Sequence, residues 1–294
     1  MTGLAGSDQT VQPTFVLVHG AFANSFSFAP LQAELGLLGH RSVAVDLPGH
    51  GFAATYTHAY QAPQDPEELA AAPGAVKGVT LADNVAHLIG VLERAKANGP
   101  VILVAHSRGG ITATAAANAR PDLIDRLVYV SAWAPVQLEA GQYYAEPEMA
   151  TADPASVALA LVGNPAELGL LRVNFRTADP QALAALKAAF LADGTDDEFL
   201  VLLNTFQPDE NLDTGTPADR AQADTWGRVP KTYVRLADDA SMPLALQDRL
   251  IREGDALTPD NPYDVRTLPG SHLKWLVDPA PAARVLGELA VLTG

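Results

Sequence analysis

The sequence predicts an α/β protein with a mostly parallel central sheet flanked by helices and a helical cap insertion. Short apolar segments rich in β-branched residues alternate with segments of helical periodicity, a pattern typical of parallel strands buried on both faces. This alternation stops after Trp133 and resumes at Lys231. We therefore predict a first core part at residues 1–134, a cap at 135–226 and a second core part at 227–294.

The first core part contains four predicted strands, each a short apolar run. They lie at residues 14–18, 42–45, 101–105 and 127–130. Helices with apolar residues recurring on one face are predicted at residues 30–38, 80–96 and 111–119. Gly39 suits the end of the first helix, because glycine readily adopts the left-handed backbone found there. Residues 61–78, rich in Pro, Ala and acidic residues, are predicted to form a surface excursion.

The second half of the chain changes character twice. Helical stretches split by Pro and Gly, with no strong strand among them, are predicted at residues 156–162, 180–191 and 196–203. The sheet pattern then returns, with strands predicted at residues 231–236 and 264–268. Helices are predicted from Pro243 and over residues 280–292. The helical block in the middle is therefore interpreted as a cap or lid over the sheet.

The composition narrows the class of partner. With 34 acidic and 19 basic residues the net charge is −15, which argues against nucleic acids and membrane surfaces as partners. The chain has no cysteine, so disulfides and cysteine-based metal sites are excluded. No apolar run approaches the roughly 18 residues of a membrane span, and residues 1–13 lack the pattern of a signal peptide. We therefore predict a cytoplasmic protein with an uncharged small-molecule substrate, and a homodimer stays open.

Ser107 is the candidate nucleophile. Residues 105–109 are Ala-His-Ser-Arg-Gly and join a predicted strand directly to a predicted helix. This is close to the G-x-S-x-G elbow, in which a sharp turn presents the serine Oγ above the sheet edge. Small residues two positions before and after the serine let strand and helix approach, and Ala105 keeps that small volume. Such a serine could instead serve only as a helix cap, but the strand directly before it favours a nucleophile.

Two backbone N–H groups near Ser107 are predicted to form an oxyanion hole, the donor pair that stabilises negative charge on a reacting carbonyl oxygen. One is the N–H of Arg108, at the start of the helix that follows the nucleophile. The other should come from the loop after the first strand, where Ala21 is the best candidate and Phe22 the alternative. His19 in the same loop is predicted to have a structural hydrogen-bonding role.

The candidate base and acid lie in the second core part. Of seven histidines only His272 follows the insertion, in a loop after a predicted strand, where the chain order Ser, Asp, His places the base. The acid should follow the strand at residues 231–236, which ends in Ala-Asp-Asp-Ala, so it is Asp238 or Asp239. Glu139, well into the loop after an earlier strand, is a weaker rival.

These segments together resemble the α/β-hydrolase superfamily. Within it they resemble the branch of plant methylesterases, salicylate-binding esterases and hydroxynitrile lyases, with their bacterial esterase relatives. The resemblance rests on residues 16–21 (VLVHGA), 39–47, 103–110, 233–243 and 270–272. In that family the acid lies six residues after the strand tyrosine and four before a proline, which here are Tyr233 and Pro243. The resemblance therefore selects Asp239 over Asp238, and it implies a helical cap after the sixth strand.

Three positions depart from the related family patterns. Hydroxynitrile lyases of this branch have Thr where Gly20 stands and Lys directly after the catalytic histidine, where this chain has Leu273. Lys274 comes one place later and is expected to face elsewhere. Both differences favour ester hydrolysis over the lyase reaction. The family usually has a hydrophobic residue at the position of Arg108, whose guanidinium is expected to pair with a cap acid or meet a substrate carboxylate, the ion pair being favoured.

Taken together, the sequence predicts a serine hydrolase that cleaves a carboxylic ester of a small, largely apolar substrate through an acyl-enzyme, with no metal or organic cofactor. The same triad could serve a lactonase, an acyltransferase or a hydroxynitrile-lyase-type C–C lyase. A non-enzymatic small-molecule binding protein on the same fold is the alternative of another class. Aromatic residues that could line the substrate pocket, or instead form cap core, are Phe22, Phe26, Trp133, Tyr144 and Phe206.

Overall fold

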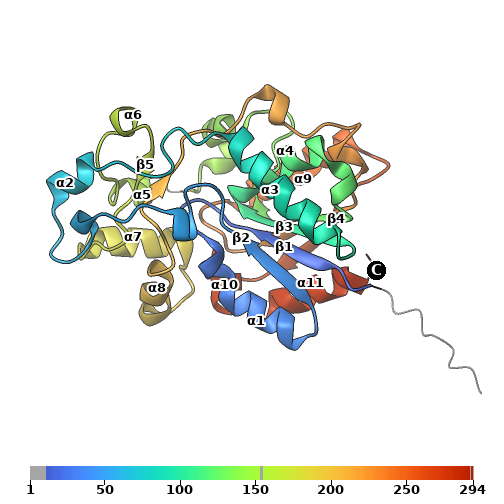
Figure 1. The fold of residues 1–294 in the computed structure, drawn as a ribbon, viewed down its shortest axis with the longest axis horizontal. Helices are drawn as coiled ribbons and strands as arrows, with labels where there is room; N and C mark the ends of the chain where they lie inside the picture. The colour runs from blue at the N-terminus through green and yellow to red at the C-terminus, as the bar shows by residue number, and fades with distance from the viewer. Residues whose placement is uncertain (1–10, 153–154, 292, 294) are drawn as a thin grey trace, which may run out of the picture.

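The computed structural model of the protein describes residues 11–152, 155–291 and 293 (Figure 1). Most of the N-terminal segment considered above, residues 1–10, lies outside the described residues, as does residue 292 at the predicted end of the last helix. Within the part of the chain that is described, no helix is long and apolar enough to cross a membrane.

The core is a sheet of six strands that all run parallel, in the order β2-β1-β3-β4-β7-β8. The strands are β1 (Thr14–Val18), β2 (Arg41–Val45), β3 (Val101–Ser107), β4 (Arg126–Ala132), β7 (Lys231–Leu236) and β8 (Asp264–Leu268). The predicted parallel α/β fold is thus confirmed. Because the chain runs from β1 to β2 and then crosses back to β3, the strand order reverses beside β1. Ligands of open α/β sheets bind at the carboxyl ends of strands at such a point.

Helices cover both faces of the sheet, which explains why its strands are continuously apolar. Alternate side chains of β1 enter different clusters, Val16 and Val18 on one face and Phe15 and Leu17 on the other. The first face is covered by α3 (Leu81–Lys96), α4 (Gly109–Ala119) and α9 (Leu244–Leu257), above the sheet in Figure 1. The second face is covered by α1 (Ala29–Leu37), α10 (Lys274–Val277) and α11 (Ala280–Val291).

The boundaries of these helices follow ordinary capping chemistry. The Thr80 hydroxyl accepts from the Asp83 N–H while the Asp83 carboxylate accepts from the Thr80 N–H, so a capping box starts α3. Helix α1 is followed by Gly39 with φ +85°, as predicted from the conformational freedom of glycine. Short 3-10 helices occur at Ser25–Phe28, Gly51–Ala53, His58–Tyr60, Pro121–Leu123, Ala140–Ala145, Pro147–Met149, Pro217–Asp219 and Trp226–Arg228.

Between β4 and β7 the chain forms mainly helices, which lie beside the carboxyl ends of the strands (Figure 1). They are α5 (Ala155–Ala158), α6 (Pro165–Leu168), α7 (Pro180–Phe190) and α8 (Asp196–Leu203). The helix predicted at 156–162 is therefore too long. It stops early because Leu161 bridges Val173 and Gly163 adopts φ +73°. Two-residue strands β5 (Leu171–Arg172) and β6 (Asp209–Glu210), which periodicity cannot signal, pair antiparallel.

The excursion at residues 61–78 contains a helix that was not predicted, α2 (Pro66–Ala71). It packs on the cap through the buried guanidinium of Arg172. This group donates to the carbonyl oxygens of Leu69 and Ala72 at 2.6 and 2.8 Å, and it forms a bidentate ion pair with Asp209. A buried arginine whose donors are satisfied in this way ties excursion and cap into one unit.

Candidate active site

Ser107 lies where β3 turns sharply into α4. Its backbone has φ +51°, and the helix begins two residues later at Gly109. A Cβ atom at Gly109 would lie 2.4 Å from the carbonyl oxygen of His19, and one at Gly110 would lie 2.2 Å from that of Trp133. The turn therefore requires glycines two and three positions after the serine. Arg108 occupies the cap position of α4 and no side chain caps the helix, so Ser107 is not a helix-capping residue.

His272 and Asp239 form a close pair at the ends of β8 and β7. Asp239 Oδ2 lies 2.6 Å from His272 Nδ1 and accepts from the Ser131 hydroxyl at 2.5 Å. Its other oxygen accepts from the N–H groups of Ser241 and Met242, both at 2.8 Å. With Nδ1–H donated to the carboxylate, Nε2 of His272 is left as the basic nitrogen, the arrangement a general base requires.

The two rival carboxylates have other partners. Asp238 is exposed and accepts from the Gly270 N–H at 3.0 Å, so it links the two loops that carry the acid and the base. Glu139 forms a capping box with Gln142 at the start of a 3-10 helix. Of the three carboxylates considered from the sequence, Asp239 is the one bonded to His272.

Ser107 and His272 line the same cavity, although no hydrogen bond joins Ser107 Oγ to the His272 ring in the described chain. His106, directly before the serine, lies against the base with ring centroids 4.5 Å apart and bonds through Nε2 to the His272 carbonyl oxygen at 3.2 Å. Burial, and after it the neighbouring His272, hold the pKa of His106 well below its ordinary value. His106 is therefore neutral and donates to the backbone of the base.

The two predicted oxyanion donors flank Ser107. The backbone N–H groups of Ala21 and Arg108 have no acceptor among the described residues, and both residues line the cavity. The N–H of Phe22, the alternative donor, is occupied by Glu210 Oε2 at 3.0 Å. Gly20 lets the loop after β1 approach Ser107 closely, since a Cβ atom at position 20 would lie 2.8 Å from the Cβ of Ser107.

Backbone strain gathers around this site. The non-glycine residues with positive φ in the described chain are Phe22 (+59°), Ser107 (+51°) and Ser131 (+37°). Phe22 comes after β1 and directly follows the donor Ala21, and Ser107, the candidate nucleophile, ends β3. Ser131 is the penultimate residue of β4 and bonds to the acid Asp239. Left-handed backbone costs such residues about 1–3 kcal/mol each and persists where the surroundings hold it, as at active sites.

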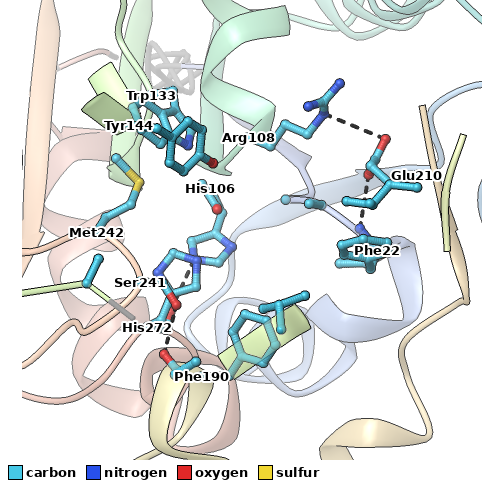
Figure 2. A pocket seen from close by; sticks show the side chains of 18 of the residues that line it. Phe22, His106, Arg108, Trp133, Tyr144, Phe190, Glu210, Ser241, Met242 and His272 are labelled. Carbon is cyan, nitrogen blue, oxygen red and sulfur yellow. Dashed lines mark hydrogen bonds and ion pairs between the residues drawn. The ribbon is translucent and has the colours of Figure 1, made fainter. Parts of the chain in front are cut away.

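Ser107 lies on the wall of a cavity of about 390 Å³, which Figure 2 shows from close by. Of the five aromatic residues named from the sequence, four line it: Phe22, Trp133, Tyr144 and Phe206. The prediction for Phe26 was wrong. Its side chain is 46% exposed and packs edge-on against Phe52 at 5.2 Å, because the 3-10 helix after β1 buries Ser27 and Phe28 instead.

The guanidinium of Arg108 pairs with an acid of the cap, the favoured of its two predicted roles. Its Nη2 donates to the side-chain oxygen of Asn211 at 2.9 Å and to the backbone oxygen of Asp213 at 2.5 Å. Its Nε lies 3.6 Å from Glu210 Oε1 (Figure 2). Cation and anion on the cavity wall thus neutralise each other.

Glu210 itself is buried and surrounded by donors. Burial alone would raise its pKa, but the Arg108 guanidinium and the bond to His50 more than reverse this and lower the pKa to about 2. His50 Nε2 lies 3.3 Å from Glu210 Oε2, and its Nδ1 lies 3.1 Å from the Pro48 carbonyl oxygen. Burial would lower the pKa of His50, but the Glu210 carboxylate raises it above its ordinary value.

A second part of the cap holds the loops of the acid and the base. The Asp193 carboxylate accepts from the hydroxyl of Ser271, directly before His272. The N–H of Leu273, directly after it, donates to the Phe190 carbonyl oxygen at 2.9 Å. On the acid loop the Ser241 hydroxyl donates to the Ala189 carbonyl oxygen at 2.8 Å. Residues 189–193 thus contact both loops.

His19 has the structural role predicted for it. Its Nε2 accepts from the Leu47 N–H at 3.2 Å and its Nδ1 bonds to the Gly20 carbonyl oxygen at 2.9 Å. Burial lowers its pKa to about 4, so the ring is neutral at pH 7 and joins β1 to the loop after β2.

The two residues after His272 take opposite positions. Leu273 is buried and lines the cavity. Lys274 is absent from the cavity wall, and its Nζ lies 3.6 Å from a Glu198 oxygen on the cap, so it faces elsewhere as expected.

Sequence reasoning missed the polar residues that support the candidate groups. They are Ser131, Glu210, His50, Asp193 and Ser271. Ser271 lies in a segment that carried the family resemblance, but only its neighbour His272 was singled out there, and the other four lie outside those segments. Each of the five acts through a partner more than thirty residues away in the sequence. Asp209 likewise pairs with Arg172, which lies far from it in the sequence. The identity of a single acidic residue in the cap therefore does not reveal its partner. No group of three or more His, Asp or Glu that could hold a metal occurs among residues 11–152 and 155–291.

Known proteins resemble this chain in sequence and in fold. A family model described as the alpha/beta hydrolase family matches residues 15–288. The chain is 26% identical to the pyrethroid hydrolase of Sphingobium wenxiniae over 94% of this chain and 86% of that protein. It is 33% identical to methylesterase 7 of Arabidopsis thaliana over 129 residues, which are 44% of this chain and 43% of that protein. The chain therefore spans less than half the length of that methylesterase.

Among solved structures, that of polyneuridine aldehyde esterase superposes with a TM-score of 0.69 at 20% identity, covering 95% of this chain and 99% of that one. At this identity the likeness concerns the fold. The family model, in contrast, matches nearly the whole chain, including the strand ends that carry Ser107, Asp239 and His272. The protein belongs to the α/β-hydrolase family.

Proposed function

We propose that the protein is a serine hydrolase that cleaves a carboxylic ester of a small, largely apolar and uncharged substrate. The observation that carries the proposal is the placement of Ser107, in a strained turn on the wall of a cavity that His272, the partner of Asp239, also lines. The similarity to methylesterase 7, pyrethroid hydrolase and polyneuridine aldehyde esterase supports ester chemistry.

In the first half of the reaction, Ser107 Oγ attacks the ester carbonyl carbon and its proton passes to His272 Nε2. The carbonyl electron pair moves onto oxygen, where the N–H groups of Ala21 and Arg108 stabilise the charge. The tetrahedral intermediate then collapses, the bond to the alcohol oxygen breaks, and the alcohol leaves with the proton from His272. Asp239 stabilises the imidazolium that forms in between.

In the second half, a water molecule gives a proton to His272 and attacks the acyl carbon. Collapse of the second intermediate returns that proton to Ser107 Oγ and releases the carboxylic acid. In hydrolases without substrate, the hydrogen bond between nucleophile and base is often long and tightens only when substrate binds. The absence of a hydrogen bond between Ser107 Oγ and the His272 ring in the described chain is therefore compatible with these reaction steps.

The charge and size of the cavity support an uncharged substrate. The cation Arg108 and the anion Glu210 on its wall lie 3.6 Å apart and offset each other, so a substrate carboxylate would gain little net attraction. Aromatic side chains and a volume of about 390 Å³ suit a compact apolar molecule. Gly20, packed against Ser107, and the apolar Leu273 favour an ester over a cyanohydrin.

The proposal is tested by the variant Ser107→Ala with p-nitrophenyl butyrate as substrate. We expect kcat/KM to fall by about 10⁴-fold or more, because the nucleophile is lost. Ser42→Ala, on the edge strand β2 away from the cavity, is the control and should match the wild type. Turnover that persisted in folded Ser107→Ala protein would overturn the assignment.

A fluorophosphonate probe separates the remaining readings of the site. Labelling of the wild type but not of Ser107→Ala is expected for a serine hydrolase. Folded wild type that resists the probe would instead indicate a binding protein. If the protein is labelled, comparison of ester, lactone and cyanohydrin substrates distinguishes esterase, lactonase and lyase, and an added alcohol acceptor detects acyl transfer.

A further inference from the structure

The buried carboxylate of Glu210 touches the backbone or side chain of residues on both sides of the proposed oxyanion hole. Oε2 accepts from the N–H of Phe22, the residue after the donor Ala21. Oε1 lies 3.6 Å from Nε of Arg108, which carries the other donor N–H. We propose that Glu210 is a positioning residue that holds both oxyanion donors in place, an inference that rests on the proposed ester hydrolysis.

On the Ala21 side the contact decides which N–H faces Ser107. Phe22 has φ +59°, a conformation that costs energy unless its surroundings hold it. The Glu210 carboxylate, which accepts from the Phe22 N–H at 3.0 Å, stabilises this conformation, because charge-assisted hydrogen bonds are roughly twice as strong as neutral ones. With the Phe22 N–H turned to Glu210, the N–H of Ala21 is left for a substrate oxygen.

On the Arg108 side the guanidinium is held through its Nη2 atom and lies beside Glu210 at its Nε atom. Asn211, the neighbour of Glu210, accepts from Arg108 through its backbone and side-chain oxygens at 3.1 and 2.9 Å. Glu210 in turn accepts from the backbone and side-chain N–H groups of Asn211, both at 2.9 Å. Glu210 and Asn211 thereby hold the side chain of the residue that immediately follows the nucleophile.

Both side-chain oxygens of Glu210 face hydrogen-bond donors, so a carboxylate satisfies them and an amide would not. One oxygen faces Phe22 N–H and His50 Nε2, and the other faces the two Asn211 donors, with Arg108 beside it. His50 donates from Nε2, and its Nδ1 also faces an acceptor, the Pro48 carbonyl oxygen. A glutamine would turn its NH₂ group toward one of these donor pairs in either orientation, and leave donors without an acceptor.

Asp209, the other residue of β6, provides a matched control. It is equally buried and also pairs with an arginine, at 2.6 and 2.7 Å, but neighbouring strand residues point to opposite faces. Its partner Arg172 holds the excursion, and neither residue lines the cavity. Asp209→Asn therefore removes a buried ion pair from the cap while the oxyanion contacts remain.

The experiment compares Glu210→Gln, Glu210→Asp and Asp209→Asn with wild type for p-nitrophenyl butyrate hydrolysis and for inhibition by an aryl trifluoromethyl ketone. For Glu210→Gln we expect kcat to fall about 10- to 100-fold with little change in KM, since misplaced oxyanion donors weaken the transition state more than the ground state. The affinity for the ketone, whose adduct places an oxyanion in the same hole, should fall by a similar factor. Asp209→Asn should lose thermal stability yet keep kcat within about twofold of wild type.

Glu210→Asp keeps the charge and withdraws it by one methylene, so it should fold and still lose kcat. An active wild type with unchanged kcat and ketone affinity in both Glu210 variants would overturn this inference alone. So would an equal loss of kcat in Asp209→Asn, since any damage to the cap would then suffice. A folded wild type that hydrolyses no ester would overturn the proposed function and this inference together.

Discussion

The carboxyl ends of the strands and the cap contribute to the candidate site in different ways. Ser107, Asp239 and His272 all follow or end parallel strands, and so do the two proposed oxyanion donors. The cap supplies part of the cavity wall and bonds to neighbours of these groups: Glu210 to Phe22, and Asp193 to Ser271. Under the proposed function, the strand ends would carry the chemistry and the cap would set how accurately the reacting groups are placed.

This division has a physical basis. Parallel strands are buried on both faces, so side chains that project from their ends are held more precisely than side chains on loops. The cap is made of short helices and two-residue strands, which hold a fixed shape only through their contacts. Variants at strand ends should therefore reduce the rate strongly, and cap variants should reduce it by smaller factors.

The largest effect in this comparison is expected for Asp239→Asn. The amide can no longer stabilise an imidazolium or select the tautomer of His272, so kcat should fall by about 10³- to 10⁴-fold. Asp238→Asn, one residue earlier and bonded to Gly270, is the control and should retain most of its activity. Steady-state kinetics with p-nitrophenyl butyrate measure both. Similar losses in the two variants would mean that Asp239 has no special role.

The ionisation of Glu210 leads to a prediction about stability. Burial raises the pKa of this carboxyl, yet Arg108 and His50 reverse the effect and lower it from 4.5 to about 2. A depressed pKa contributes stability above the unfolded-state value, and that contribution is lost as the pH falls toward 2. Between pH 6 and pH 3 the wild type should lose about 2 kcal/mol of unfolding free energy through this group.

The control for that prediction is Glu210→Gln, which lacks the titrating group. Urea unfolding at both pH values should show the wild type losing about 2 kcal/mol more than the variant. Equal losses in the two proteins would show that Glu210 ionises no differently in the folded and unfolded states. The cap would then hold the oxyanion loop by shape and not by charge.

The same contrast separates what the sequence could predict from what it could not. Residues 14–18 and 101–105 are apolar because helices cover both sides of the sheet, so their pattern is visible without partners. The two residues of β6, Asp209 and Glu210, are held in place by contacts with residues far away in the sequence. These residues are Arg172, Arg108 and Phe22. No local pattern encodes such contacts, and the helix predicted at 156–162 was too long for the same reason.

Within the candidate site the predictable part is the part that one short segment specifies. Ser107 was predictable because its turn needs small neighbours in a fixed order, and Gly109 and Gly110 do pack against His19 and Trp133. Phe26 was wrongly predicted to line the cavity. The sequence shows that this residue is aromatic but not toward which side the 3-10 helix directs its side chain. Ser131 shares Asp239 with His272, yet a buried serine at the end of a strand is common and gives no signal.

The smallest effect is expected where the cap touches the base loop. Asp193→Ala removes the acceptor of the Ser271 hydroxyl and of the Ser271 N–H. His272 keeps its bond to Asp239, and the loop keeps the bond from Leu273 to Phe190. The bond of the hydroxyl is partly buried and is the shorter of the two. Such a bond contributes about 1 kcal/mol, which corresponds to a loss in kcat of roughly three- to tenfold if it serves to place the base.

The matched control is Asp197→Ala, an exposed acid in the first turn of α8 whose side chain has no hydrogen bond within the described structure. Asp193→Ala should lower kcat with an unchanged KM, and Asp197→Ala should leave both constants as in the wild type. Equal kinetics in the two variants would restrict the positioning role of the cap to Glu210. A loss as large as that of Asp239→Asn would remove the distinction between sheet edge and cap, because the placement of His272 would then matter as much as its ionisation.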